Sequence, residues 1–273
     1  EKNHAISGEL DKTATIIDHF FTGRVITKEE NETNLVITNY IDWLDSSNIK
    51  YKPRIDLNLH LPNLEKKWKL HFTSYDEDSQ SRGINKNRLK TSAPRERYGA
   101  SVVLLEKIGK VNVTFRPKLE IKSTVTTSFL LRFERKKDLG KIIFKPRLEF
   151  FGKADTGTGQ FVAINWDIPL NDIFTLFFIN EEQYENTNHL LSVTHGLGIS
   201  HPYNDSMSQT YGLNFEYGRR PAYHLERYTF ASSFRHQWYR DVLHYSFTPY
   251  VVWDEEKRFS GTFGINVLIH FIF

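Results

Sequence analysis

One pair of side chains in this sequence could perform acid–base chemistry: His244 and Ser246, separated by Tyr245. A serine hydroxyl becomes a nucleophile when a base lies within hydrogen-bonding reach. Residues i and i+2 of a β-strand point to the same face, so a strand would bring these two side chains together. A third group is needed to orient the histidine, and the nearest acidic run is 254–256. Such pairs are common by chance, so His244 and Ser246 are weak catalytic candidates.

A second set of candidate residues is basic and recurs at every second position. Three short stretches, YKPRID, FRPKLE and FKPRLE, each carry two cations and then an anion at positions i, i+2 and i+4. With basic residues from other segments, they give the candidate binding residues Lys52, Arg54, Arg116, Lys118, Arg132, Lys145, Arg147, Arg227 and Arg235. Fewer acidic residues share these faces: Asp56, Glu120, Glu134, Glu149 and Glu216. A face of this composition either forms a ladder of ion pairs or attracts anions.

The sequence offers little for a metal or a cofactor. Cysteine is absent, which excludes disulfides, thiolate catalysis and cysteine-ligated metals. His189, His195 and His201 recur at six-residue intervals, but six residues of a strand span about 20 Å, too far for one metal ion. We therefore expect these histidines at a boundary or on an outer face, and no metal or cofactor. A net charge of +3 gives no case for nucleic acid.

The segments that carry the candidate residues alternate apolar and polar side chains from about residue 34 onward. The 21 Phe and 13 Tyr against a single Met favour strands over helices. Roughly fourteen segments of about ten residues follow one another, the length of a tilted strand that crosses a bilayer. The connections between them alternate between short turns and longer loops, the longest being the polar stretch YDEDSQSRGINKNRLKTSAPRE. A water-soluble β-sandwich would also alternate, and it is the alternative to a membrane barrel.

Aromatic residues lie near the ends of these segments. Trp68 and Trp166 are close to the short turns, whereas Trp43, Tyr98, Tyr217 and Trp253 are close to the longer loops. Indole and phenol rings favour the boundary between membrane and water. Two such belts are therefore expected to flank an apolar band.

The sequence finishes on GINVLIHFIF, with apolar residues at alternate positions Ile265, Val267, Ile269, Phe271 and Phe273. This ending resembles the C-terminal targeting strand of bacterial outer-membrane β-barrel proteins. The resemblance concerns architecture and identifies no particular family within them. It implies a location in the outer membrane of a Gram-negative bacterium, export with a signal peptide removed, and recognition of Phe273 and Phe271 by the barrel-assembly machinery.

The expected fold is all-β: a transmembrane antiparallel up-and-down barrel of about fourteen strands, with twelve as the alternative. Residues 34–273 would form the barrel. Residues 1–33 would form a periplasmic or plug segment, in which Ile16, Ile17, Phe20 and Phe21 have the spacing of a short amphipathic helix. Pro53, Pro117 and Pro146 each remove a ladder donor, so we expect a bulge or kink at each.

Three functions remain open at this point. A lumen lined by Lys and Arg predicts a channel that is weakly selective for small acidic solutes. The same charges could instead seal a structural or surface-interaction barrel, with the N-terminal segment as a plug. Some outer-membrane barrels are lipid hydrolases with a His-x-Ser pair on the outer face, but here alternation places His244 and Ser246 inward. The basic stretch within 81–97 could contact lipopolysaccharide phosphates, lie in solvent or fold into the barrel.

Overall fold

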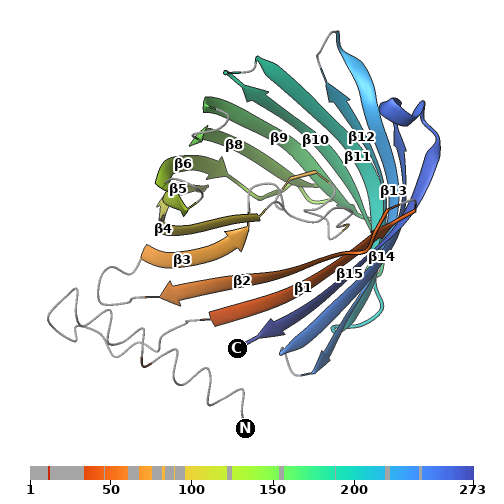
Figure 1. The fold of residues 1–273 in the computed structure, drawn as a ribbon, viewed down its shortest axis with the longest axis horizontal. Helices are drawn as coiled ribbons and strands as arrows, with labels where there is room; N and C mark the ends of the chain where they lie inside the picture. Colours follow the sequence, from red (N-terminus) through yellow and green to blue (C-terminus); the bar gives the residue numbers. More distant parts are fainter. Residues whose placement is uncertain are drawn as a thin grey trace, which may run out of the picture.

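The chain forms a single closed sheet of antiparallel strands around a central interior (Figure 1). The computed structural model describes Lys12 and residues 34–45, 47–60, 68–75, 82–83, 89, 96–121, 125–153, 157–187, 189–218, 222–239 and 242–273. Its strands are β1 (Asn34–Leu44), β2 (Lys50–His60), β3 (Trp68–Tyr75), β4 (Glu96–Ile108), β5 (Val111–Ile121), β6 (Val125–Glu134), β7 (Lys137–Asp138), β8 (Ile143–Lys153), β9 (Gly157–Pro169), β10 (Thr175–Glu185), β11 (Leu190–Pro202), β12 (Met207–Gly218), β13 (His224–Tyr239), β14 (Leu243–Asp254) and β15 (Gly261–Ile272).

Fourteen of these fifteen strands build the barrel, since β7 has only two residues and extends the edge of β8. Each strand pairs with its neighbours in sequence, and a pairing between β6 and β8 spans the short β7. The prediction of fourteen strands rather than twelve is confirmed. A short 3-10 turn, Glu255–Lys257, lies between β14 and β15.

The barrel closes where the last strand meets the first. β15 pairs antiparallel with β1 from Val36 opposite Ile272 to Leu44 opposite Gly264. Beyond the strands, the Leu35 N–H donates to the Phe273 carbonyl at 3.1 Å, and the Phe273 N–H donates to the Leu35 carbonyl at 2.9 Å. Closure of this kind removes the unpaired edge that an open sheet would expose.

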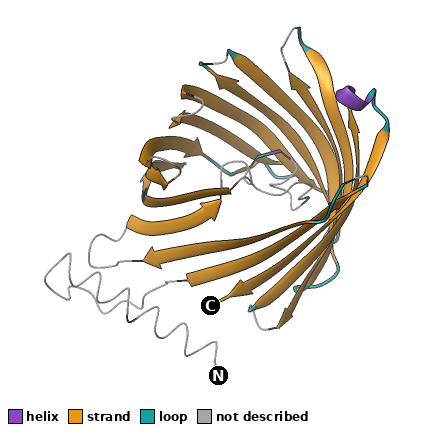
Figure 2. Cartoon of the chain, in the orientation of Figure 1, coloured by secondary structure: helices purple, strands orange, loops and turns teal. Residues whose placement is uncertain are grey.

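The two ends of the barrel differ in the connections they carry (Figure 2). At one end, here called the short-turn end, lie the connections 61–67, 109–110, 135–142, 170–174, 203–206 and 240–242, together with the C-terminus. At the other, the loop end, lie 45–49, 76–95, 122–124, 154–156, 186–189, 219–223 and 255–260. The connection 76–95 at the loop end is the longest, but the other connections of the two ends overlap in length, so the predicted contrast between short turns and longer loops rests on 76–95 alone.

Aromatic side chains gather near both ends on the outer face. At the loop end, Tyr228 stacks on Trp253 with ring centroids 4.7 Å apart, and Trp43 meets Phe263 edge-on at 5.9 Å. At the short-turn end, Trp166 stacks on Phe144 at 6.4 Å. These positions match the two predicted belts; the side chain of Trp68 lies outside the described residues.

The prolines of the charged repeats behave differently from prediction. The registers β1–β2, β5–β6 and β8–β9 run unbroken through Pro53, Pro117 and Pro146, so the predicted bulges are wrong. On its other side, each proline faces a break in the ladder. The β2–β3 pairing reaches only Asp56, the β4–β5 pairing skips Pro117, and the β6–β8 pairing ends at Arg147. A residue without an N–H is accommodated where one side of its strand needs no donor.

The predicted N-terminal helix, with Ile16, Ile17, Phe20 and Phe21, lies outside the described residues, and the division of the chain at residue 33 stays a prediction. The first described strand begins at Asn34. Within the part of the chain that the structure describes, no helix is long and apolar enough to cross a bilayer.

Glycines on the inner face leave room for large interior side chains. Gly198 of β11 lies opposite Phe177 of β10 and Gly212 of β12. A Cβ atom added at Gly198 would overlap the Phe177 ring and the backbone carbonyl of Tyr211. The backbone carbonyl cannot move aside, so this position excludes larger residues.

We therefore expect Gly198→Val to destabilise the barrel by about 1–3 kcal/mol, the usual cost of overpacking. The measurement is the temperature at which the detergent-solubilised protein loses its folded, faster-migrating gel band. Gly109→Ala is a matched control, because a Cβ there meets nothing within 4 Å, although its φ of +60° adds a small backbone strain. Equal transition temperatures for Gly198→Val and wild type would contradict the packing described here.

Candidate functional site

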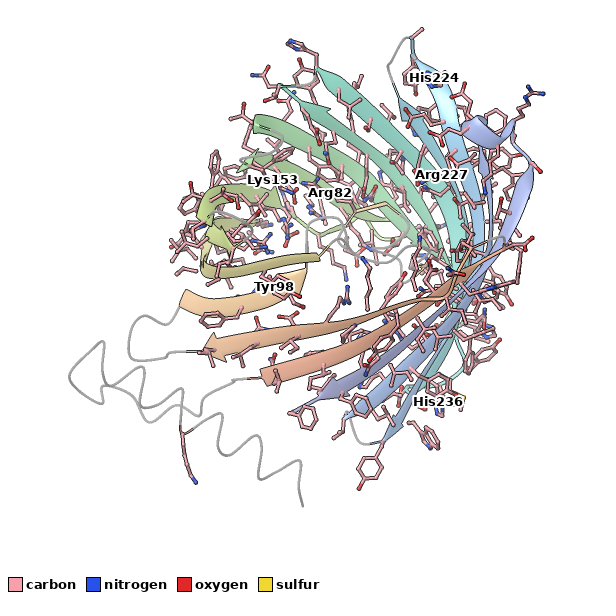
Figure 3. All side chains as sticks on the ribbon, in the orientation of Figure 1. Arg82, Tyr98, Lys153, His224, Arg227 and His236 are labelled. Atoms are coloured by element: carbon pink, nitrogen blue, oxygen red, sulfur yellow. The ribbon has the colours of Figure 1, made fainter. Side chains whose placement is uncertain are left out.

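The interior of the barrel gathers the charged residues of the chain (Figure 3). Strand pairing places the nine predicted basic residues on this inner face: Lys52, Arg54, Arg116, Lys118, Arg132, Lys145, Arg147, Arg227 and Arg235. The alternation that the sequence showed therefore puts these residues on the correct side of the wall. The structure then divides them among several separate groups.

The tightest group surrounds Glu149 of β8, whose side chain is 0% exposed. The Arg132 Nε donates to Glu149 Oε1 at 2.6 Å, and the Arg147 Nε donates to the same oxygen at 2.5 Å. Arg82, from the long connection 76–95, holds the other oxygen, Oε2, at 2.5 Å through its Nη2. One buried carboxylate thus carries three guanidinium groups, an arrangement that offsets the cost of taking each charge out of water.

Further contacts hold Arg82 in this position. Its Nη1 donates to Gln183 Oε1, and its guanidinium lies 4.4 Å from the centroid of the Phe161 ring. The neighbouring Gly83 N–H donates to Glu181 Oε2 at 2.6 Å. Three adjacent strands of the wall, β8, β9 and β10, therefore bind this part of the connection, and Figure 3 shows Arg82 inside the barrel.

The same connection touches the interior again at Leu89. This side chain is 0% exposed and belongs to an apolar cluster with Phe177, Ile179, Ala231 and Tyr250. The cluster spans β10, β13 and β14. A Cβ added at Gly212 would overlap Leu89 Cδ1, so the glycine provides the space that Leu89 fills.

Arg82, Gly83 and Leu89 therefore contact inner-face residues from β8 to β14, and we call these three described residues the inner segment. The sequence allows three locations for the basic stretch: lipopolysaccharide, solvent or the barrel interior. Arg82, Gly83 and Leu89 lie in the interior.

Three of the remaining predicted cations have these acidic or polar neighbours. Lys145 forms an ion pair with Asp167 of β9. Arg227, near the loop end, holds Asp254 at 3.1 Å and lies 3.7 Å from Glu216. Arg235, toward the short-turn end, lies opposite Ser208 and Ser246.

The distribution of charge corrects the predicted excess of cations over the whole lining. On β2–β8 the same registers put these described cations on the inner face: Lys50, Lys52, Arg54, Lys107, Arg116, Lys118, Arg132, Lys145, Arg147 and Lys153. The described inward acids of these strands are Asp56, Glu120, Glu134 and Glu149. Strands β9 and β10 contain no basic residue and contribute the acids Asp167, Glu181 and Glu185. The excess of cations is therefore confined to one sector of the wall, β2–β8.

The opposite sector is lined mainly by small neutral side chains. Strands β12–β15 bury Thr210, Asn214, Thr229, Ser233, Thr248 and Asn266 on their inner faces. Thr248 Oγ1 donates to Ser233 Oγ at 2.8 Å. The Oδ1 atoms of Asn214 and Asn266 are buried and have no hydrogen-bond partner among the residues that the structure describes. This sector therefore presents hydroxyl and amide groups, in contrast to the charged sector across the interior.

The His244–Ser246 pair lies on the inner face, as predicted. His244 is opposite His270 and Gln237, and Ser246 is opposite Leu268 and Arg235. The acidic candidates lie at the far end of the same strand, since Asp254 is eight residues from Ser246, about 26 Å along a strand. Asp254 accepts a hydrogen bond from Arg227. These acids therefore do not complete a catalytic triad with the pair.

Sequence reasoning missed several interior residues. Arg82 and Leu89 belong to a connection whose position depends on partners far away in sequence: Arg82 and Gln183 are 101 residues apart. The signal available was the length of the connection and the apolar Leu89 within a polar stretch. Asp167 and Glu181 could have been found from the alternation of β9 and β10, because both lie on the same faces as predicted inward residues.

Comparisons with known proteins bear on the fold. No protein-family model and no curated protein matches the sequence. The structure is similar to the outer membrane channel DcaP of Acinetobacter baumannii, with a TM-score of 0.53, 9% identity, and coverage of 89% of this chain and 97% of that chain. It is also similar to in-vitro folded OmpT, an outer membrane protein of Vibrio cholerae, with a TM-score of 0.54, 6% identity, and coverage of 92% and 100%. The fold is therefore that of bacterial outer-membrane β-barrels.

The contacts of the inner segment give a direct test with a cysteine reporter, because the chain has no cysteine of its own. In Leu89→Cys, we expect slow reaction with a water-soluble maleimide, since position 89 is buried against β10, β13 and β14. Adding Arg82→Ala removes the ion pair with Glu149 and should speed labelling by about tenfold or more, the effect of losing a hydrogen bond to a charged group.

The matched control is Leu89→Cys with Arg135→Ala, because Arg135 lies in the connection 135–142, away from the inner segment. Fast labelling of Leu89→Cys in the otherwise unchanged protein would contradict the position of Leu89. A rate that Arg82→Ala leaves unaltered would contradict the anchoring role of Arg82.

Proposed function

We propose that this protein is an outer-membrane channel for small solutes, weakly selective for anions, whose interior is narrowed by the inner segment. The observation that carries the proposal is the cation-rich sector β2–β8 of the inner wall. The fold supports a place in the outer membrane, because both similar structures are of outer-membrane proteins and one of them, DcaP, is described as a channel.

The size of the barrel favours a lumen that side chains alone do not fill. About eight strands already enclose an interior that side chains can fill, and the diameter grows with strand number. This barrel has fourteen long strands, counting fifteen less the two-residue β7. Polypeptide other than the strands is needed to narrow the lumen, and the inner segment is part of such polypeptide.

The charges support a modest rather than a strong anion preference. Cations exceed acids on β2–β8, where Arg116 and Lys118 lie side by side on the inner face of β5. Glu149 and Glu181 are already engaged with Arg82, Gly83 and neighbouring side chains. Acids on β9 and β10 reduce the net field, so anions gain an advantage mainly when they pass along the cation-rich sector.

The alternative is a sealed barrel with a structural or surface-interaction role. The buried inner side chains of β14 and β15, such as Thr248 and Asn266 at 0% exposure, favour it because an open wall would leave them wet. The two functions differ in one measurable property, the passage of ions.

Purified protein in planar bilayers should show stepwise conductance, and a salt gradient should give a reversal potential that favours chloride over potassium. We expect Arg116→Gln with Lys118→Gln to lower that preference roughly two- to fourfold. A unit charge about 10 Å from an ion in water contributes about 0.4 kcal/mol before screening by salt.

One control and two contradicting outcomes complete this test of ion passage. The matched control, Lys257→Gln with Arg258→Gln, changes two exposed cations beyond the end of β14 and should leave the ion preference nearly unchanged. Baseline conductance in wild type and in Arg82→Ala with Leu89→Ala would overturn the channel and favour the sealed barrel. A cation preference in wild type would overturn the selectivity.

A further inference from the structure

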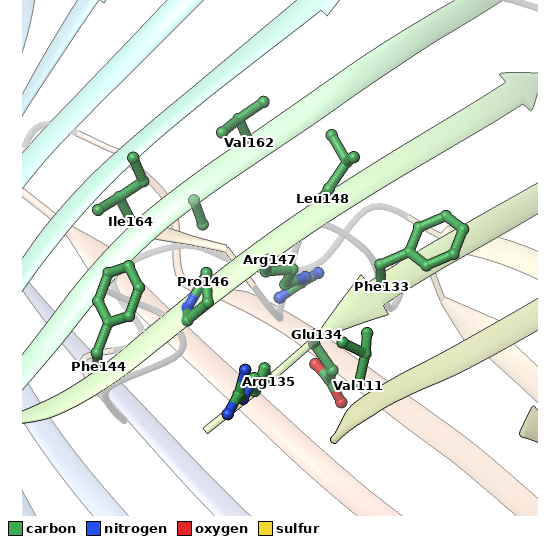
Figure 4. A pocket seen from close by; sticks show the side chains of 11 residues that line it. Val111, Phe133, Glu134, Arg135, Phe144, Pro146, Arg147, Leu148, Val162 and Ile164 are labelled. Carbon is green, nitrogen blue, oxygen red and sulfur yellow. The ribbon is translucent and has the colours of Figure 1, made fainter. Parts of the chain in front are cut away.

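A groove on the outer face of the barrel has the features of a binding site for one lipid. The groove lies over β6, β8 and β9, has a volume of about 420 Å³, and is lined by apolar side chains (Figure 4). Its outward-facing side chains are Phe133, Phe144, Pro146, Leu148, Val162 and Ile164. An apolar recess of this volume suits a hydrocarbon chain rather than a polar solute.

The groove lies where the pairing of β8 with the strand before it is interrupted between β6 and β7. The β6–β8 ladder ends at Glu134 opposite Arg147, and the next residue, Arg135, donates its N–H to the Pro146 carbonyl at 3.1 Å. Pro146 has no N–H to continue the ladder on this side. One hydrogen bond between the strands is therefore missing at Pro146, before β7 resumes the pairing with Lys137 opposite Phe144. Figure 4 shows Phe133 and Phe144 on the two sides of Pro146.

The short-turn end of the groove opens onto a basic connection. Arg135 itself lines the groove, and the connection continues with the exposed residues Lys136, Lys137 and Lys141. No other connection of the short-turn end carries as many basic residues in sequence. Its one acid, Asp138, accepts a hydrogen bond from the Gly140 N–H at 2.7 Å and so closes the turn.

Apolar side chains in the same connection indicate contact with a membrane surface. Leu139, between Lys137 and Lys141, is 54% exposed, and Ile142, directly after Lys141, is 37% exposed. Basic residues interleaved with exposed apolar ones are typical of segments that rest on an anionic lipid surface. The apolar groove thus matches an acyl chain, and the basic connection at its end matches a phosphate. The two groups are adjacent in a phospholipid in the same way.

We propose that this site binds one anionic phospholipid, with an acyl chain along the groove and the phosphate beside Arg135, Lys136, Lys137 and Lys141. The proposal rests on the membrane placement contained in the proposed function but not on ion conduction. A second copy of the chain could also cover an apolar groove, and the charge of the connection favours the lipid because phosphate complements four cations.

Trp166 provides a reporter for the site. It pairs with Phe144, a residue that lines the groove, and stacks on that ring at 6.4 Å. A protein that keeps Trp166 as its sole tryptophan, with the other four changed to phenylalanine, is reconstituted in phosphatidylcholine. Brominated phosphatidylglycerol or brominated phosphatidylcholine is then added, and the quenching of Trp166 is compared.

We expect brominated phosphatidylglycerol to quench Trp166 at a mole fraction about fivefold or more lower, since each basic residue near an anionic surface contributes a factor of that order. Lys136→Gln with Lys137→Gln and Lys141→Gln should remove most of this preference. Lys257→Gln with Arg258→Gln, at the loop end, is the matched control and should keep it. Val162→Phe, which fills the groove, should weaken it.

Equal quenching by the two lipids would overturn the proposal, and protection of Trp166 from both would indicate a second copy of the chain instead. If the tryptophan replacements prevent folding, native mass spectrometry of the otherwise unchanged protein counts the retained phosphatidylglycerol molecules. The three-lysine variant must then retain fewer than wild type. Because neither readout depends on ion flow, a sealed barrel would leave both results unchanged.

Discussion

Closure of the backbone hydrogen-bond ladder is the constraint on which the rest of this structure depends. Hydrocarbon offers no hydrogen-bond partner, so a strand in a membrane must pair on both sides. The pairing of β15 with β1, extended by the reciprocal hydrogen bonds of Leu35 and Phe273, removes the last free edge. The prolines of the charged repeats obey the same constraint, because each lies beside a position where one neighbouring ladder is already broken.

Closure of the barrel also determines which face of each strand carries the charged residues. Once one face of every strand meets an apolar surrounding, the polar residues of the alternation are forced into a common interior. There a carboxylate such as Glu149 is tolerable only with partners, since an unpaired buried charge is costly. Arg132 and Arg147 come from the wall, and Arg82 comes from a connection that must enter the barrel to reach it. These ion pairs thus compensate the charge of Glu149 and also hold Arg82 inside the barrel, where its side chain reduces the width of the lumen.

Much of this architecture could be predicted from the sequence, because alternation is a local property. The inward positions of Arg116 and Lys118 follow from period two along a single strand. The inner segment could not be placed in the same way, since Arg82 depends on Glu149 and Gln183, 67 and 101 residues away. The bulges predicted at the prolines are wrong, because each proline has an intact ladder on one side only.

In the candidate site, too, one part follows from local alternation and another part depends on residues distant in sequence. The nine basic residues were identified correctly as inward-facing, but their net effect depends on acids such as Asp167 and Glu181 across the sheet. Pairing between strands is a property of the register, which fixes neighbours that no single segment reveals. The excess of cations therefore became a feature of one sector of the wall and not of the whole lining.

The central claim is that the outer face meets hydrocarbon while the inner face meets water. Spin labels placed one at a time at Thr114, Phe115, Arg116 and Leu119 of β5 test it most directly, by their accessibility in a bilayer to oxygen and to a water-soluble nickel chelate. The account predicts that oxygen reaches Phe115 and Leu119 preferentially, and that the chelate reaches Thr114 and Arg116. Equal access of the chelate to all four positions would contradict it.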